Sequence, residues 1–198
     1  MLLFIWGLLG CSEPEDKRKL LEKGRFALQK SVEWILTDEG QTQPIKLELH
    51  KKEAIITFDK GKQRILGHYI PKDEIKYLNQ LGDILAYMRY TDEHLVFYNA
   101  DKKATWYVKI LPDRVQISDN SKNSSPFEIR LAENGSFKVH TPSKLIGDVK
   151  CKEGILTAKG NKRYETPMKA NHPAFGVLLL NDITEEWRLI IWTELLRY

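Results

Sequence analysis

The stretch Glu128-Ile129-Arg130-Leu131-Ala132-Glu133-Asn134-Gly135-Ser136-Phe137-Lys138-Val139 decides the fold, because it contains two alternating segments joined by a turn. Ile129 and Leu131 alternate with charged residues in the first segment, and Phe137 and Val139 flank Lys138 in the second. An alternation of period two is typical of half-buried strands in an antiparallel sheet. Asparagine and glycine between the segments favour a turn. The stretch therefore predicts two neighbouring strands, each with one apolar face.

The same unit recurs along the chain. Residues 148–158 can be laid over 128–139, a similar unit lies at 108–127, and looser copies lie at 85–107 and 46–69. The period is roughly 20–24 residues, which is typical of structural repeats. A second turn follows each of the two clearest units, at Pro142-Ser143-Lys144 and at Gly160-Asn161-Lys162. We expect about ten to twelve short antiparallel strands, enough for a barrel or a two-layer sandwich.

The pattern lapses between residues 69 and 83. Pro71 and the acidic residues after it could open a short helix through Ile75, Leu78 and Leu81. The segment could equally be a loop that crosses the sheet, and the sequence leaves both readings open.

After Pro167 the pattern becomes helical. Residues 173–180 form a short apolar segment, and Asp182 is expected to cap a second helix with Glu185 as its capping-box partner. The polar residues of this helix form only a narrow stripe, consisting of Glu186, Thr193 and Arg197. Such a helix must be covered on most sides, and at about 15 residues it is too short to span a bilayer.

Another amphipathic helix is expected over residues 14–36, where Leu21, Leu28, Val32 and Ile35 recur at helical spacing. It could lie on a membrane or pack against the following sheet. The predicted fold class is therefore α+β and mainly β: an N-terminal helix, an antiparallel meander, and an apolar C-terminal helix in or on the sheet.

The chain begins with an apolar run, Met1 to Gly10, which is followed by Cys11 and a polar stretch. Leu8-Leu9-Gly10-Cys11 resembles the lipobox of bacterial lipoproteins. The resemblance implies that residues 1–10 are a cleaved signal peptide and that Cys11 carries lipid such as palmitate. Residues 11–40 would then hold the anchor and helix, and residues 41–198 a single β-rich domain. The alternative is an apolar arm packed on the domain, with Cys11 an ordinary thiol.

An acylated Cys11 implies a protein of the bacterial cell envelope, anchored to a membrane and facing the periplasm or the cell surface. Two or more acyl chains anchor a protein stably, whereas one is marginal. Five basic residues follow the cysteine: Lys17, Arg18, Lys19, Lys23 and Arg25. Each could contribute about 1 kcal/mol against anionic headgroups. The formal net charge of +4 favours such contact weakly.

Short repeated strands that end in a mostly apolar helix are similar to the tubby and phospholipid-scramblase fold. That family wraps an antiparallel barrel around a buried C-terminal helix, and its members are associated with membrane lipids. The resemblance covers residues 44–198 and concerns architecture, because no residue motif of the family is present to carry over.

No catalytic motif emerges from the remaining residues. The five histidines (His50, His68, His94, His140 and His172) have no metal-ligand spacing. Asp92-Glu93-His94 reads as a polar turn, and Cys151 alternates with lysines as an inward-facing small residue would. We expect no metal and no cofactor.

Two further segments could either bind a partner or be ordinary parts of the fold. Residues 102–109 mix lysines with Trp106 and Tyr107, as single-strand nucleic-acid binders do, yet on a strand these aromatics point to opposite faces. We therefore expect one of them in the core and no nucleic-acid partner. The polar tip at residues 120–125 is a recognition loop or a solvated hairpin.

The sequence thus predicts a non-catalytic, membrane-anchored envelope protein whose β domain binds lipid or an envelope partner. The alternative is a structural or assembly protein with no small ligand, and the third is an enzyme. A pocket lined by apolar side chains would favour lipid binding, and a filled interior would favour the structural role. A histidine that meets Asp92 or Glu93 in a cleft would favour an enzyme.

Overall fold

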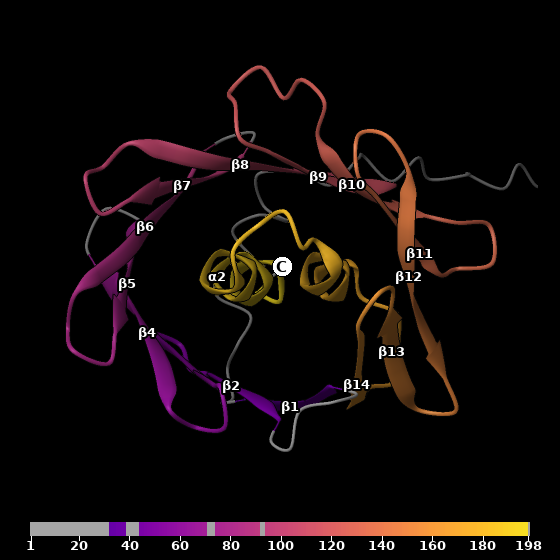
Figure 1. Cartoon of the computed structure of the whole chain (residues 1–198), viewed down its shortest axis with the longest axis horizontal. Coiled ribbons are helices and arrows are strands. Elements are labelled where there is room, and N and C mark those ends of the chain that lie inside the picture. The colour runs from indigo at the N-terminus through magenta and orange to yellow at the C-terminus, as the bar shows by residue number, and fades with distance from the viewer. Residues whose placement is uncertain (1–31, 39–43, 71–73, 92–93, 198) are drawn as a thin grey trace, which may run out of the picture.

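The computed structural model describes residues 32–38, 44–70, 74–91 and 94–197. Fourteen antiparallel strands form a closed barrel in which each strand pairs with its sequence neighbours and β14 pairs with β1. The prediction of a mainly β fold is confirmed. Of the barrel and the two-layer sandwich, which the sequence did not distinguish, the chain forms the barrel (Figure 1). The strands are β1 (Val32–Asp38), β2 (Ile45–Leu49), β3 (Glu53–Phe58), β4 (Gln63–Ile70), β5 (Glu74–Asn79), β6 (Ile84–Tyr90), β7 (Leu95–Asn99), β8 (Ala104–Leu111), β9 (Arg114–Ser118), β10 (Phe127–Leu131), β11 (Phe137–His140), β12 (Leu145–Lys152), β13 (Ile155–Lys159) and β14 (Arg163–Pro167).

The stretch that predicted a hairpin forms one. Ile129 on β10 lies opposite Val139 on β11, and both are fully buried on the inner face. Gly135 turns the chain between them with φ of 76°, a backbone conformation that side chains with a Cβ rarely adopt. The alternation therefore predicted the pairing and the buried face at these positions but not at Leu131, which is 48% exposed at the end of β10.

The expected ten to twelve strands were too few, because two segments were not recognised. Residues 74–79, which read as a helix or a crossing loop, form β5 and pair on both sides, with β4 and with β6. The second missed strand is β1.

Strand β1 corrects the predicted helix over residues 14–36 where that helix can be compared with the structure. Residues 32–36 pair with β2 over five positions, from Val32 opposite Leu49 to Leu36 opposite Ile45. Leu36 is fully buried, whereas Ile35 is 45% exposed, which is the alternation of a strand and not of a helix. The barrel thus includes residues before the expected domain start at residue 41. The rest of the predicted helix lies outside the described residues.

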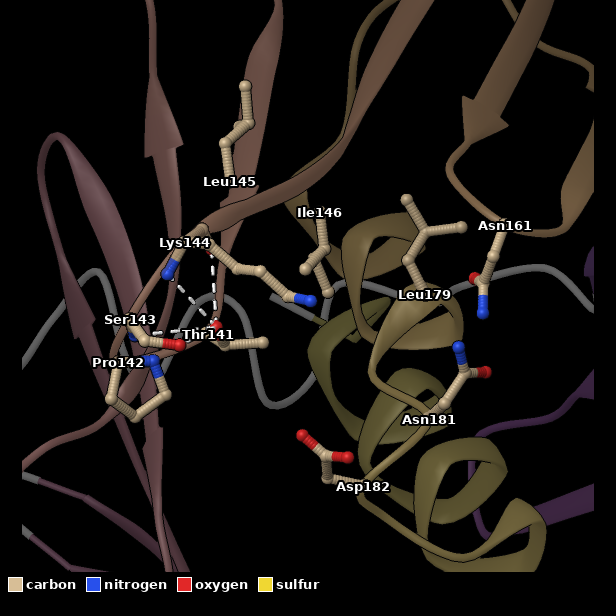
Figure 2. A pocket seen from close by; sticks show the side chains of 10 residues that line it. All are labelled: Thr141, Pro142, Ser143, Lys144, Leu145, Ile146, Asn161, Leu179, Asn181 and Asp182. Carbon is tan, nitrogen blue, oxygen red and sulfur yellow. Dashed lines mark hydrogen bonds between the residues drawn. The ribbon is translucent and has the colours of Figure 1, made fainter.

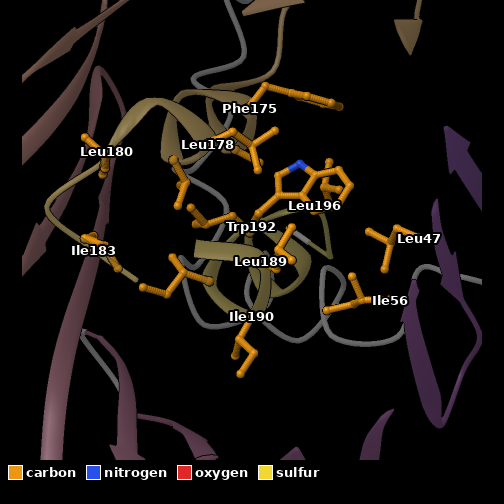
Figure 3. Packing of buried hydrophobic residues seen from close by; sticks show 14 of the residues in the cluster. Leu47, Ile56, Phe175, Leu178, Leu180, Ile183, Leu189, Ile190, Trp192 and Leu196 are labelled. Carbon is orange, nitrogen blue, oxygen red and sulfur yellow. The ribbon is translucent and has the colours of Figure 1, made fainter. Parts of the chain in front are cut away.

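The two helices of the described chain lie inside the barrel (Figure 1). The 3₁₀ helix η1 (Pro173–Leu179) is followed by α2 (Glu185–Leu195), and their buried side chains join those of the inner strand faces in one core. Phe175 of η1 packs edge-on against Trp192 of α2 at 5.7 Å between ring centroids (Figure 3). The apolar helix is covered, as its sequence required. Neither helix is long and apolar enough to cross a bilayer.

The predicted start of this helix was wrong. Thr184 and not Asp182 is the N-cap of α2, and no side chain caps the helix, so the expected partnership with Glu185 is absent. Asp182 belongs instead to the connection between η1 and α2. The helix has 11 residues rather than about 15, because it begins at Glu185 after the Thr184 cap and ends at Leu195.

Alternate strand connections gather at opposite ends of the barrel. The β11–β12 and β13–β14 connections lie at the end where η1 turns into α2, which we call the pocket end. The opposite end holds the start of β1, the β2–β3 connection and Arg197, and we call it the C-terminal end. The chain therefore enters the barrel and closes its final helix at the same end.

Candidate functional site

A cavity of about 490 Å³ opens at the pocket end, between the β11–β12 loop and the connection from η1 to α2. Figure 2 shows its lining side chains, which come from three separate stretches of the chain. They are Thr141, Pro142, Ser143, Lys144, Leu145, Ile146, Asn161, Leu179, Asn181 and Asp182. Polar side chains predominate around an aliphatic floor.

One wall is the β11–β12 loop, residues 141–144. The backbone N–H of Thr141 donates to the carbonyl of Lys144 at 2.9 Å, and the Thr141 hydroxyl accepts from the N–H of Lys144 at 3.2 Å. These bonds close a tight turn, a common use of threonine in connections. The Lys144 side chain extends from this wall into the cavity (Figure 2).

The opposite wall is positioned by a buried arginine. Arg188 on α2 is only 8% exposed, and its Nη1 donates to the carbonyl of Leu178 at 3.2 Å and to Oδ1 of Asn181 at 2.9 Å. With its oxygen held, Asn181 points its NH₂ group toward the side chain of Asn161, which lies beside it on the side of the view away from the 141–144 loop (Figure 2). The Asp182 carboxylate points into the same space.

A second groove, of about 430 Å³, lies on the other side of the 141–144 loop. Its central carboxylate belongs to Glu128, which accepts hydrogen bonds from Gln116 at 2.8 Å and from Arg130 at 2.6 Å. Burial opposes ionisation of Glu128, but these two hydrogen bonds and the charges of Arg130 and Arg114 outweigh it and lower its pKa. Glu128 is therefore an ionised partner of basic groups, which does not suit it for work as a general base near neutral pH.

The polar tip at residues 120–125 forms part of this second groove. Asn123 and Ser125 line it, and Nδ2 of Asn123 donates to Oε1 of Gln116 at 2.7 Å. The tip is also bound internally, because Oδ1 of Asn120 accepts from the N–H of Ser124 at 3.1 Å. The loop is an ordered rim between β9 and β10.

A different polar cluster is buried at the C-terminal end. Glu194 of α2 is fully buried and accepts hydrogen bonds from the hydroxyls of Tyr77 and of Tyr90, the latter at 2.9 Å. Burial, followed by the charge of Glu194, raises the pKa of both tyrosines, so both hydroxyls keep the proton that they donate. Nε of Arg197 lies 3.3 Å from Glu194.

Arg197 ties this cluster to the barrel wall. Its Nη1 donates to the carbonyl of His50 at 3.2 Å, and its Nη2 donates to that of Glu53 at 3.1 Å. The guanidinium also lies over the ring of Tyr69, 5.0 Å from the centroid. Because Glu194, Tyr77 and Arg197 are buried, we interpret the cluster as a structural latch that holds α2 in the lumen, and we call it the latch.

Most of the sequence-predicted site residues cannot be compared with the structure. Cys11, Lys17, Arg18, Lys19, Lys23 and Arg25 lie outside the described residues, as do Asp92 and Glu93. Within the described ranges, no three His, Cys, Asp or Glu side chains form a group that could hold a metal ion. His172 has a structural role, because its Nδ1 accepts from the N–H of Ala174 and caps η1.

Cys151 and Trp106 lie as their strand patterns predicted. Cys151 is half-buried, and its thiol donates to the carbonyl of Met168 at 3.0 Å. Trp106 packs against the core and tilts against Phe127 with 6.4 Å between ring centroids. One aromatic of the basic segment 102–109 is thus committed to packing.

Sequence reasoning found the turns of the cavity but not the cavity itself. Pro142-Ser143-Lys144 and Gly160-Asn161-Lys162 were recognised as equivalent turns of successive repeats. Equivalent turns of a two-strand repeat lie at the same end of a sheet, so this spacing contained the signal. The opposite wall, at Asn181 and Asp182, could not be predicted from a sequence pattern, because it depends on the chain folding back into the lumen.

A comparison with known proteins finds no family model, no curated protein and no solved structure that matches this chain. Its function must therefore be inferred from the residues and the geometry described above.

Proposed function

We propose that the chain is a membrane-anchored, non-catalytic protein of the bacterial envelope that binds an envelope partner through the outer surface and rims of its barrel. The observation that carries this proposal is the position of η1 and α2. The two helices occupy the lumen and pack their apolar side chains against the inner strand faces (Figure 3). In lipid-carrying barrels that space holds the ligand, whereas here the chain's own helices fill it. Partners would therefore meet the barrel from outside.

The anchor in this proposal is lipid on Cys11. The support is the resemblance of Leu8-Leu9-Gly10-Cys11 to a lipobox. The basic residues that follow (Lys17, Arg18, Lys19, Lys23 and Arg25) would add attraction to anionic headgroups. The resemblance of residues 44–198 to the tubby and phospholipid-scramblase fold, whose members are associated with membrane lipids, stays a prediction from the sequence pattern.

Vesicle flotation tests the membrane contact. A Cys11→Ser chain without lipid should float with anionic vesicles at low salt and be released at high salt, because the contact is electrostatic. Replacing all five basic residues by glutamine should abolish flotation, whereas replacing five exposed lysines of the barrel loops (Lys51, Lys60, Lys103, Lys122 and Lys144) should weaken it only slightly. Equal binding to neutral vesicles at high salt would refute the headgroup contact.

A structural or assembly role without any small ligand is the second candidate. The same lumen helices favour it, because a filled barrel is a rigid scaffold for protein contacts. Photo-crosslinking in the native bacterium tests it, with the probe at exposed Ser143 on the pocket end or at exposed Glu153 on the C-terminal end. One discrete crosslinked protein from a single end would support a partner surface. The same diffuse products from both ends would count against one.

A further inference from the structure

We propose that the cavity at the pocket end is a binding site for a neutral, hydroxyl-rich ligand, an oligosaccharide chain. The site belongs to the barrel and does not depend on the lipid anchor, so it goes beyond the function proposed above. Four features of its lining support this assignment.

The first feature is charge balance. Lys144 contributes one positive and Asp182 one negative side chain, and the rest of the lining is uncharged. A strongly anionic ligand would meet the Asp182 carboxylate, and a cationic ligand would meet the Lys144 ammonium. A neutral ligand with both donors and acceptors can use both groups, since a sugar hydroxyl donates to a carboxylate and accepts from an ammonium.

The second feature is the fixed orientation of the Asn181 amide. Buried Arg188 holds Oδ1 of Asn181 at 2.9 Å, which leaves the NH₂ group as a fixed donor on the cavity side. The amide of Asn161 lies beside it (Figure 2). A polar group whose orientation is set by a buried neighbour loses less entropy on binding than a free surface side chain. The donors of this site are therefore partly preorganised.

The third feature is the floor. Leu179 is 1% exposed and sits against the backbone of two glycines, where an added Cβ would lie 2.8 Å from its Cδ1 at Gly147 and 3.6 Å from its Cδ2 at Gly160. Leu179 is thus fixed in place and almost fully covered, and half-buried Ile146 supplies the aliphatic surface that a ligand can contact below the polar rim. A pyranose ring has the matching character, with C–H groups on its face and hydroxyls around its edge.

The fourth feature is size. A cavity of about 490 Å³ falls within the usual range of roughly 300–1,000 Å³ for small-ligand sites. An apolar ligand of the same volume would leave the cavity's charged and amide groups without partners.

Isothermal titration of the full chain in detergent tests the assignment. The neutral probes are maltotetraose, cellotetraose and chitotetraose, and the anionic comparison probes are tripolyphosphate and tetraglutamate. At least one neutral probe should bind, and Asn181→Ala and Asp182→Ala should each weaken it about tenfold, the loss expected for one hydrogen bond to a charged or fixed group. Two matched controls on other loops of the same end, Lys122→Ala and Asp101→Ala, should leave the affinity within about twofold.

Asn181 and Asp182 are exposed, and the near-ultraviolet circular dichroism of each variant reports whether its core is intact. Saturation-transfer NMR on the same probes gives a second measurement and shows which sugar protons contact the protein. The proposal is overturned if no neutral probe binds at about 10 mM, a concentration that detects millimolar dissociation constants. It is also overturned if only the anionic probes bind, or if both cavity variants bind as well as the controls.

Discussion

At the scale of single residues, the latch buries a carboxyl group and a guanidinium group together at the end of α2. The carboxyl group of Glu194 is fully buried, and Arg197 and two tyrosine hydroxyls supply the partners that a buried polar group needs. Breaking one partner of a buried pair is costly, since the other charge is left without compensation.

Arg197→Ala should therefore lower the free energy of unfolding by about 3–5 kcal/mol. Urea denaturation followed by tryptophan fluorescence measures the change. Arg64→Ala, on an exposed position of β4, is the matched control and should change stability by less than about 0.5 kcal/mol. Equal effects of the two variants would contradict the latch.

Gly67 makes room for the tyrosine that reaches this latch. A Cβ at Gly67 would lie 2.7 Å from Cε1 of Tyr77, which pairs with it across β4 and β5. Gly67→Ala should cost about 1–3 kcal/mol, the usual range for overpacking. In a Tyr77→Leu background the same substitution should cost clearly less, because the obstructing ring is gone. A double-mutant cycle measures this coupling, and strict additivity would rule out the contact.

His172 gives the barrel a defined acid response. Burial lowers its pKa below the usual value near 6.5, and its unprotonated Nδ1 accepts the capping bond from Ala174. As pH falls below about 6.5, the unfolded chain takes up the proton before the folded chain does, so stability falls until the lower folded pKa is passed. His172→Asn keeps a capping acceptor and should remove this slope.

Urea midpoints at several pH values between 7 and about 4.5 measure the response. A His172→Asn chain with the same pH dependence as the unmodified chain would contradict this role.

At the scale of elements, the sequence predicted local pairing well and long-range context poorly. The hairpin of β10 and β11 followed from its own residues, because alternation and an Asn-Gly turn act over a few positions. Strand β1 did not, since Val32 and Ile35 also fit a helical period. This segment is a strand because it pairs with β2 on one side and with β14 on the other, where Thr37 lies opposite Glu165. The β14 partner is remote in sequence and cannot be read from local residues.

The same limit applies to the candidate site. The turns at residues 142–144 and 160–162 could be read from the repeat, and their common end of the barrel followed from strand direction. Asn181 was not recognisable, because its role depends on Arg188 and on a helix that folds back inside the barrel. Asp182 was expected to cap the last helix, a position that Thr184 occupies.

The strand assignment of β1 makes a sharp prediction for two adjacent residues. Leu36 faces the lumen and is fully buried, so Leu36→Ala should cost about 2–5 kcal/mol. Ile35 points outward, and Ile35→Ala should cost less than about 1 kcal/mol. The helical reading counted Ile35 among the apolar face, so an Ile35→Ala variant as unstable as Leu36→Ala would favour it. Urea denaturation of both variants gives the answer.

At the scale of the whole molecule, the barrel is a closed wall around its own last two helices. The strands supply the inner apolar faces, η1 and α2 fill the space between them, and the latch fixes the last turn at the C-terminal end. The chain enters β1 at that same end, whereas the cavity opens at the pocket end. If the chain is anchored through its N-terminal segment, the candidate binding site lies at the end of the barrel opposite to the start of β1.

The anchor is the central claim, and radiolabelled palmitate incorporation in the native bacterium tests it most directly. The unmodified chain and Cys11→Ser are compared, followed by fractionation into membrane and soluble material. We predict label for the unmodified chain and none for Cys11→Ser. After a high-salt wash, which removes electrostatic contact, the unmodified chain should stay with the membranes and Cys11→Ser should be released. No label in either chain would contradict the account and make residues 1–11 a segment without an anchor.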